Sequence, residues 1–291
     1  MCLLLLTPGL LFEYQATRLN GMGILLVSAI TLLVTGLWAW LPKYRLREAI
    51  RAPFPDRFVA ILETNVPVYS KMTVELQQQL QHLIKQFLHQ KTFYGCGGLA
   101  INDEIKVTIA GIACLLLLNR KSHVYPQLTS VLVYPSAFVA PRTEIEPGGV
   151  VTYHEEGLLG ESWGDGRVVL AWDEVKEDAS DFSDGHNVVL HEFAHQLDDE
   201  TGSADGVPIL GKRASYQSWA AVFSREYAAL QSSAFHRDET FLDPYGATNP
   251  AEFFAVVTET FFEMPVELAE HHPELFGELE SYYRVDPRAW Q

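Results

Sequence analysis

The segment His191-Glu192-Phe193-Ala194-His195 places two histidines four residues apart, with a glutamate directly after the first of them. In an α-helix, residues i and i+4 lie on the same face, so both imidazole rings would project to the same side. Two neutral imidazoles in this arrangement can bind one Zn²⁺ ion, and Glu192 is then placed to act as a base toward a water molecule at the metal. The motif therefore demands a helix, and a fold that brings a third ligand to the same face.

The residues around the motif favour a helix that is largely buried. Before it, Asp181–Gly185 is a run of helix breakers with two N-cap candidates, Ser183 and Asp184. A helix from about His186 would bury four apolar residues, Val189, Leu190, Phe193 and Leu197. After the helix, Gly202 is suited to a left-handed exit. The alternative is a helix that carries two half-exposed histidines and a solvated glutamate.

A catalytic zinc usually has three protein ligands and an open position for water, so a further residue must complete the site. The best candidate is Glu252, much later in the chain. Asn249 as N-cap and Pro250 at the first helical position predict the start of a helix there. Glu252 is its third residue, and Glu259 lies two turns further along the same face. Most other positions are apolar, so both carboxylates are expected to face the interior, where they need partners.

Each of these acidic residues also has another interpretation. Glu252 can satisfy the backbone of its own N-cap in a capping box, and Glu259 can be an exposed helix charge. Asp198, three residues after His195, is the rival third ligand, although an aspartate there is more often a helix-end residue or a partner of a ligand. We expect Glu252 to be the ligand and Glu259 to hydrogen-bond to one.

Several further runs resemble one known family, the Mlc titration factor A family of zinc peptidases, whose catalytic domain is related to anthrax lethal factor. The similar runs extend from about Asn65 to about Arg288, and they are 91–93, 98–99, 103–104, 133–138, 161–163, 169–172, 191–198 and 245–255. The resemblance implies an α+β, mainly helical, zincin-like metallopeptidase domain with a small β-sheet. It also implies that zinc is bound by His191, His195 and Glu252, and that Glu192 is the catalytic base.

Tyr245 lies seven residues before Glu252 and matches the same family pattern. In lethal-factor-like sites, a tyrosine at this spacing helps to stabilise the oxyanion, so the resemblance implies a catalytic role. A phenol is a neutral donor that can point at developing negative charge. The alternative is that Tyr245 is only the third residue of a type I turn formed by residues 243–246.

The N-terminal part of the chain predicts a membrane anchor. Met22–Leu41 contains no charged residue and is rich in Leu, Ile and Val, and about twenty helical residues span the ~30 Å hydrocarbon core of a bilayer. Trp38 and Trp40 lie near one end, where interfacial aromatic residues belong. Basic residues follow directly, at Lys43, Arg45, Arg47 and Arg51. The positive-inside rule therefore predicts a single-pass protein of the inner membrane with its C-terminal domain in the cytoplasm.

A cleaved signal peptide is the alternative, but the segment has no basic start and no small-residue cleavage site. Translation can begin at Met1 or at Met22, and the status of residues 1–21 is left open. The predicted organisation is a transmembrane helix at 22–41, a juxtamembrane linker at 42–64 and a zinc peptidase domain at 65–291.

Periodicity predicts the main elements of that domain. Residues 74–90 carry an apolar stripe on one face, which indicates a helix, and residues 104–118 are apolar on nearly every side, which indicates a central helix. Residues 131–134 and 168–172 read as strands. The strand near Trp163–Trp172 is either a core strand or one that pairs with an extended substrate. Cys114 is expected to be a core thiol, and no disulfide is expected.

Two classes of function follow. One is a membrane-anchored zinc peptidase that hydrolyses peptide bonds in a peptide or protein substrate. The other is a regulatory protein with weak peptidase activity that sequesters a transcriptional repressor, because the resemblance implies binding of the glucose-related repressor Mlc. The net charge of −16, with no basic stripe after Arg51, argues against direct binding of nucleic acid.

Overall fold

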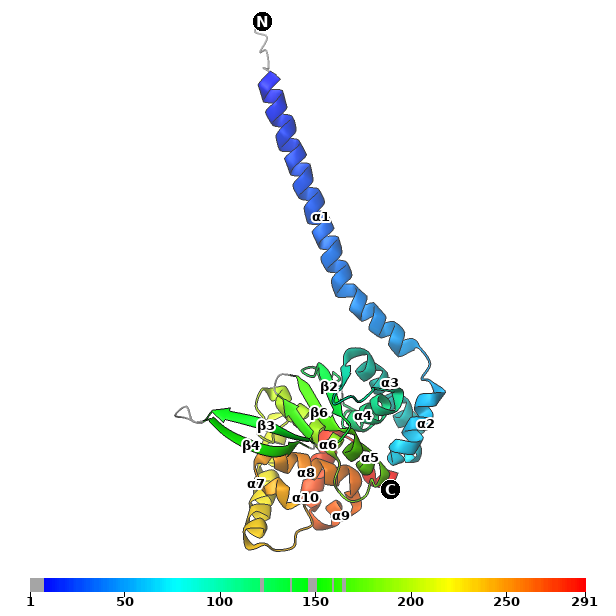
Figure 1. Ribbon diagram of the computed structural model, residues 1–291, viewed down its shortest axis with the longest axis vertical. Helices are drawn as coiled ribbons and strands as arrows, with labels where there is room; N and C mark the ends of the chain where they lie inside the picture. Colours follow the sequence, from blue (N-terminus) through cyan, green and yellow to red (C-terminus); the bar gives the residue numbers. More distant parts are fainter. Residues whose placement is uncertain (1–7, 121–122, 137, 146–150, 159, 164–165) are drawn as a thin grey trace. The chain divides into compact units, whose positions relative to one another are not determined.

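A computed structural model describes residues 8–120, 123–136, 138–145, 151–158, 160–163 and 166–291 (Figure 1). The chain divides into two compact units, and the boundary lies between Ala52 and Pro53. The first seven residues of the predicted N-terminal segment 1–21 lie outside the described residues.

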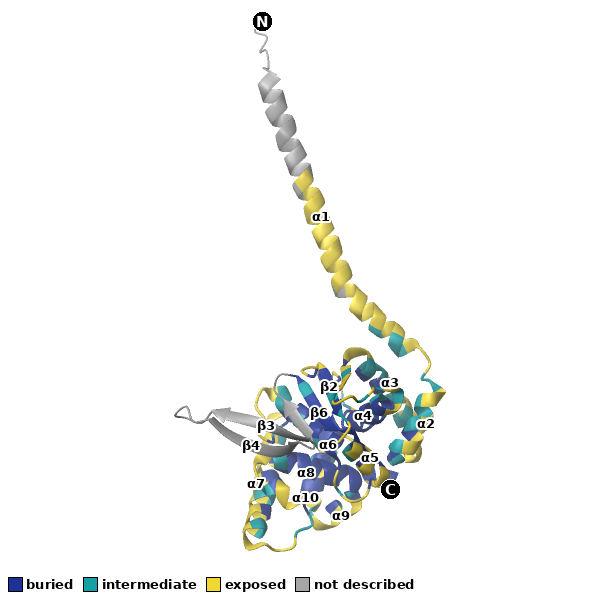
Figure 2. Cartoon of the chain, viewed as in Figure 1, coloured by how far each residue is buried: buried dark blue, intermediate teal, exposed yellow. Residues whose placement is uncertain are grey.

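The first unit is one long helix, α1 (Pro8–Arg51), which covers the predicted span Met22–Leu41. Among the described residues, one helix is long and apolar enough to cross a membrane, by length and composition: Leu25–Arg51, with a mean hydropathy of 1.8. Its apolar side chains lie on the surface, including Leu32 at 73% exposed and Trp38 at 82% (Figure 2). Exposed apolar surface of this extent is typical of a segment that contacts lipid or another protein.

The second unit begins at Pro53, so the segment expected to be a linker, 42–64, does not form one. The first part of the segment 42–64 continues α1, and its last part lies in α2 (Asp56–Asn65). The 3₁₀ helix η1 (Pro67–Lys71) follows α2. The physical reason is Leu62, which is fully buried against Gly111, where an added Cβ would lie 2.7 Å from the Leu62 side chain. α2 is therefore part of the globular core.

The two helices predicted for the first half of this unit are present. α3 (Val74–Gln90) has the predicted bounds and buries one stripe, Leu80, Leu83, Ile84 and Phe87. α4 (Asp103–Leu115) begins at the N-cap Asn102, whose side chain accepts a hydrogen bond from the Ile105 amide at 2.9 Å. Every residue from Val107 to Leu118 is buried, but α4 ends at Leu115 and the last three residues form a turn. Cys114 is buried, as expected for a core thiol.

The central sheet has four strands in the order β1-β2-β6-β5, and its members are β1 (Thr92–Gly95), β2 (Ser130–Tyr134), β6 (Arg167–Ala171) and β5 (Gly160–Trp163). β1, β2 and β6 are parallel, whereas β5 runs antiparallel to β6 at the edge. The predicted strand 168–172 ends one residue early, because Trp172 starts the helix α5 (Trp172–Ser180). β3 (Phe138–Ile145) and β4 (Val151–Leu158) form a separate antiparallel pair.

The C-terminal half is helical, and it supplies most of the surroundings of the histidine motif. Its elements are α6 (Val188–Asp198), η2 (Asp199–Thr201), α7 (Arg213–His236), η3 (Pro244–Ala247), α8 (Pro250–Glu263), α9 (Pro265–His271), α10 (Pro273–Tyr283) and η4 (Pro287–Trp290). α6 packs against α8, α4 and the sheet, and both α6 and α8 are largely buried (Figure 2). The fold is thus the predicted α+β class, mainly helical with a small sheet.

An aromatic cluster holds α6 in place. Phe193, in the middle of the histidine motif, is fully buried, and its ring centroid lies 4.8 Å from that of Tyr125 and 5.7 Å from that of Phe87. Buried aromatic side chains contribute both area and specific ring geometry to a core. Packing on this side of α6 leaves the two histidines on its opposite side, where α8 lies.

Candidate metal centre

The helix that carries the histidines begins at Val188, close to the expected start near His186, but its N-cap is Asn187 and neither Ser183 nor Asp184. The Asn187 side chain accepts a hydrogen bond from the Leu190 amide at 3.1 Å. The Val188 amide donates to Asp178 at 2.7 Å, and the Asn187 amide donates to Glu259 at 2.6 Å. Buried acceptors from two other helices therefore satisfy the first amides of α6, which no local pattern reveals. The predicted exit is confirmed, because Gly202 follows η2 with a φ of 86°.

The helix that carries Glu252 begins as predicted. Asn249 caps α8 by accepting a hydrogen bond from the Glu252 amide at 3.0 Å, and Pro250 is the first helical residue. The Glu252 carboxylate is directed at the histidines: its Oε2 lies 3.0 Å from Nε2 of His191 and 3.4 Å from Nε2 of His195. The side chain therefore faces the motif, while only its backbone amide takes part in the cap.

Three side-chain atoms converge between α6 and α8. Nε2 of His191, Nε2 of His195 and Oε2 of Glu252 form a triangle with sides of 3.0, 3.2 and 3.4 Å. Donors placed about 2.0–2.2 Å from a tetrahedral zinc lie roughly 3.3–3.6 Å apart, so the triangle is close to the required size. Two imidazole nitrogens and a carboxylate oxygen are also the donor types that zinc prefers. Among the described residues, these three form the group able to hold a metal ion.

Glu259 lies behind His191, on the side away from this triangle. Its Oε1 is 2.7 Å from Nδ1 of His191, and the carboxylate is only 2% exposed. Burial opposes protonation of His191, but its contacts with Glu252 and Glu259 outweigh burial and raise its pKa to about 10. A carboxylate on the second ring nitrogen orients a ligating imidazole and selects its tautomer. Glu259 therefore has the position expected of a partner to a ligand, and is not an exposed charge.

Glu192 is buried beside the same group. It is 5% exposed, and its Oε2 is buried without a hydrogen-bond partner within the described chain. Burial raises the pKa of Glu192 to about 7, although the charges of His191 and His195 oppose this shift. A carboxyl group with a pKa near neutrality and an uncommitted oxygen can both accept and return a proton.

Asp198 is not part of the three-residue group. Its side chain is fully buried, and its Oδ2 accepts a hydrogen bond from the Gly206 amide at 2.7 Å. Asp198 therefore ties the end of α6 to the following loop, which is the helix-end role considered above.

Tyr245 lies in η3, close to the histidines. The turn is present, because the Asp243 side chain accepts a hydrogen bond from the Tyr245 amide at 2.8 Å. Nevertheless, the Tyr245 ring centroid is 6.0 Å from that of His191, and the side chain is 54% exposed. Gly246 allows η3 to pack closely on α7 and α8, since an added Cβ would lie 3.3 Å from side chains of both Leu230 and Val256. Tyr245 is thus a turn residue that also borders the candidate site.

Sequence reasoning did not identify Asp178 and Glu263 as parts of this site. Glu263 accepts hydrogen bonds from the Asn187 side chain at 3.0 Å and from the Gly185 amide at 3.1 Å. A signal for Glu263 is present in the chain, because residues 252, 259 and 263 are separated by seven and four residues, which places them on one face of α8. No comparable signal marks Asp178, which comes from a separate helix, α5.

Comparison with known proteins matches residues 40–284 to the model of one family, the glucose-regulated metallo-peptidase M90 family. The chain belongs to this family. An uncharacterised protein of Synechocystis sp. is 43% identical over 249 residues, which is 85% of this chain and 90% of the relative. Mlc titration factor A of Pectobacterium atrosepticum is 33% identical, covering 78% of this chain and 87% of the relative. The corresponding protein of Serratia proteamaculans is 32% identical, with coverages of 77% and 86%.

Membership of the M90 family confirms the resemblance to Mlc titration factor A that the motifs indicate. The matched residues contain the whole histidine motif and α8. A metallopeptidase family implies a metal, and the donor triangle between α6 and α8 is where the described residues can hold one.

Proposed function

We propose that this protein is a zinc-dependent peptidase that hydrolyses peptide bonds at the site between α6 and α8. The observation that carries the proposal is the convergence of His191, His195 and Glu252 next to the unpaired Glu192 oxygen. When bound there, zinc would polarise a carbonyl oxygen and lower the pKa of water to about 7. Glu192 would accept the proton of the attacking water and then deliver it to the leaving amine.

The experiment that tests this proposal is cleavage of a peptide library by the purified chain, analysed by mass spectrometry. Cleavage is expected after loading with zinc, and it should stop with a chelator and resume on adding zinc back. If no peptide in a diverse library is cleaved by protein that carries a full equivalent of zinc, the proposed activity is wrong.

The edge strand β5 is the element best placed to align an extended substrate. The segment near Trp163–Trp172, predicted as one strand, forms parts of two strands, β5 and β6. β6 is already paired on both sides, with β2 and β5, so it has no edge for a peptide. Among the described strands, β5 pairs only with β6, and it packs against α6, so its backbone can form a further ladder of hydrogen bonds with a peptide. Strand addition places the peptide backbone beside the metal helix without demanding a particular side chain.

Tyr245 is proposed to donate a hydrogen bond to the oxyanion that develops on the scissile carbonyl. Tyr245→Phe keeps the ring and removes only the hydroxyl, so zinc content, melting temperature and KM are expected to stay near normal. Because the hydroxyl acts on charge present only in the transition state, kcat should fall about 10²–10³-fold, or roughly 2.7–4 kcal/mol. Steady-state kinetics on a library-derived peptide measures this effect.

Tyr94→Phe is the matched control, because Tyr94 is also 54% exposed. Tyr94 lies on β1, which is the edge strand opposite to β5. It should leave kcat unchanged. An unchanged kcat for Tyr245→Phe would return that residue to a purely structural role in the turn, whereas lost zinc would show that it supports the start of α8.

A second candidate function is regulatory binding, favoured by the relatives named Mlc titration factor A. In this case, the chain would bind a transcriptional repressor related to Mlc and hold it at the membrane. Pull-down of purified Mlc by the intact chain and by Glu192→Gln separates the two functions. Equal binding by both, together with no peptide cleavage by the intact chain, would make sequestration the function.

We also propose that α1 anchors the protein in the inner membrane, with the enzyme domain on the cytoplasmic side. Removal of residues 1–52 is expected to release a folded domain into the soluble fraction, because the second unit has its own core from Pro53 onward. Fractionation followed by circular dichroism measures this result. The deletion product staying in the membrane fraction would mean that the second unit binds membranes by itself.

Reporter fusions after Arg51 test on which side of the membrane the C-terminal end of α1 lies. The basic residues after the span predict a signal from a cytoplasmic reporter. A signal only from a periplasmic reporter would overturn the orientation.

A further inference from the structure

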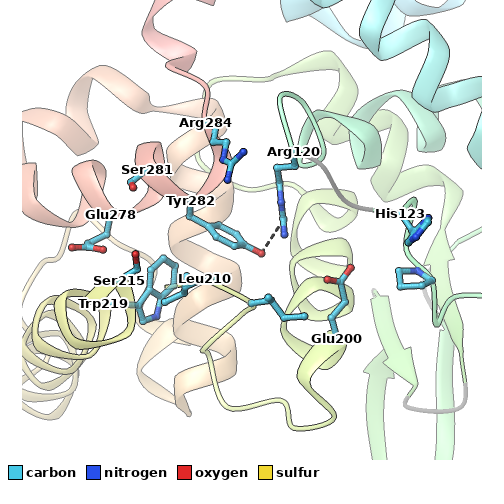
Figure 3. A pocket seen from close by; sticks show the side chains of 13 residues that line it. Arg120, His123, Glu200, Leu210, Ser215, Trp219, Glu278, Ser281, Tyr282 and Arg284 are labelled. Atoms are coloured by element: carbon cyan, nitrogen blue, oxygen red, sulfur yellow. Dashed lines mark hydrogen bonds between the residues drawn. The ribbon is translucent and has the colours of Figure 1, made fainter. Parts of the chain in front are cut away.

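A second site lies away from the metal centre, in a cavity of about 380 Å³. Its walls come from the loop after α4, the turn η2, the loop before α7, and the facing sides of α7 and α10 (Figure 3). None of His191, His195 and Glu252 lines it. The volume is at the small end of the range of about 300–1,000 Å³ that is typical of ligand pockets.

Two guanidinium groups supply positive charge to this cavity. Arg120 donates to the Tyr282 hydroxyl at 2.9 Å and stacks 4.4 Å from the centroid of that ring, and Figure 3 shows it reaching between Tyr282 and Glu200. Arg284 lines the same cavity, and no side-chain ion pair joins either arginine to a carboxylate within the described part of the chain. A guanidinium has five N–H donors, so most of those on both residues are available to a carboxylate.

Glu200 supplies negative charge on another wall. Its Oε1 is buried and has no hydrogen-bond partner among the described residues, and burial raises its pKa while Arg120 and His123 oppose the shift. A buried carboxylate oxygen without a donor is costly, so this position favours a ligand that brings one. The second carboxylate of the cavity, Glu278, already accepts a hydrogen bond from Ser218.

The rest of the lining is largely apolar, with two serines, Ser215 and Ser281, among it. Trp219 is 1% exposed, its ring nitrogen donates to the Gly206 carbonyl at 3.1 Å, and its ring stacks on Phe223. Leu210 and Tyr282 complete this wall. The cavity thus combines two guanidinium groups, one carboxylate with an unsatisfied oxygen, and the apolar side chains of Ile209 and Leu210.

We propose that this cavity binds a small zwitterion, namely a free amino acid or a dipeptide with an apolar side chain. The ligand carboxylate would pair with Arg120 and Arg284, its ammonium group with Glu200, and its side chain with Ile209 and Leu210. A simple anion such as phosphate satisfies the arginines but meets repulsion from Glu200, and a simple cation meets the reverse.

The cavity is also joined to both metal helices through one residue, Gly206. Its carbonyl accepts the Trp219 ring N–H, and its amide donates to Asp198 at the end of α6. Gly206 has a φ of 76°, and an added Cβ would lie 2.3 Å from the Pro250 carbonyl at the start of α8. A ligand that binds the folded chain in this cavity is expected to raise its melting temperature.

Isothermal titration calorimetry on the full chain in detergent tests the proposal with four probes. L-leucine and Leu-Leu carry both charges, whereas N-acetyl-leucine lacks the cation and leucinamide lacks the carboxylate. Leu-Leu is titrated into Glu192→Gln, so that hydrolysis does not contribute heat. At least one zwitterion should bind, and each capped leucine should bind about tenfold or more weakly than leucine, as expected for loss of one charge-assisted pair. Stronger binding of Leu-Leu than of leucine would identify a dipeptide as the ligand class. Stronger binding of leucine would identify a free amino acid.

Variants assign each charge to its residue. Glu200→Gln should weaken the binding of leucine but not that of N-acetyl-leucine. Arg284→Gln should weaken the binding of leucine but not that of leucinamide. Arg237→Gln is the matched control, because Arg237 has the same φ of 59° at a helix C-cap but does not line the cavity. No binding of either zwitterion at ~10 mM, or measurable binding of leucine and N-acetyl-leucine with equal affinity, would overturn the proposal.

Discussion

His195→Ala is expected to leave the purified chain without its zinc and without peptidase activity. The substitution removes one corner of the donor triangle, and the two donors that remain, on His191 and Glu252, do not satisfy a zinc ion. Loss of a residue that only supports a ligand already costs about 10–100-fold in metal affinity, so loss of a ligand should cost more. Elemental analysis of protein purified at matched concentrations measures the zinc content.

The fold should survive this change. The His195 side chain is 15% exposed, while the core-facing side of α6 is filled by Phe193 and its aromatic neighbours. Circular dichroism should therefore show an unchanged helical spectrum. His271→Ala, at an exposed histidine on α9, is the control and should keep a full equivalent of zinc. Full zinc in His195→Ala would remove that residue from the metal centre.

Glu192→Gln is expected to keep the zinc and lose most of the turnover. Glutamine has nearly the same shape and fits the same 5% exposed position, so folding and metal binding should be unaffected. An amide cannot accept the proton of the attacking water, and loss of a general base typically costs about 10²–10⁴-fold in rate. The kcat on a library-derived peptide, together with zinc content, measures both parts of the expectation.

Glu177→Gln, at an exposed glutamate of α5, is the control and should match the unmodified chain in both measurements. A Glu192→Gln protein that retains both zinc and full turnover would exclude Glu192 as the base. A protein that loses zinc would instead mean that Glu192 helps to hold the metal.

Local sequence patterns correctly predicted those parts of the candidate site that depend on neighbours in the chain. The start of α8 at Asn249 and Pro250 is one such part, and the helical pairing of His191 with His195 is another. Capping and helical periodicity act over a few residues, so their signals are complete within a short window. The apolar stripe of α3 predicted both of its ends for the same reason.

The N-cap of α6 could not be predicted in this way. Ser183 and Asp184 are good caps by residue type, yet the helix is capped by Asn187. Its first amides are bound by Asp178 of α5 and Glu259 of α8, which packing brings from elsewhere in the chain. The extent of the linker predicted at 42–64 could not be read from local patterns for a similar reason, since burial of Leu62 against α4 makes α2 part of the core.

The histidine motif, the apolar span, the main helices and strands, and the family are all evident from the order of the amino acids alone. Which of several acidic residues faces the histidines depends on how the helices pack. Glu252 forms the third corner of the donor triangle, Glu259 lies behind His191, and Asp198 accepts a hydrogen bond from Gly206. Packing also brings Arg120, Glu200 and Arg284 to one cavity from three distant segments. Periodicity gives each side chain a direction relative to its own helix, but only the packing of helices against one another determines what lies in that direction.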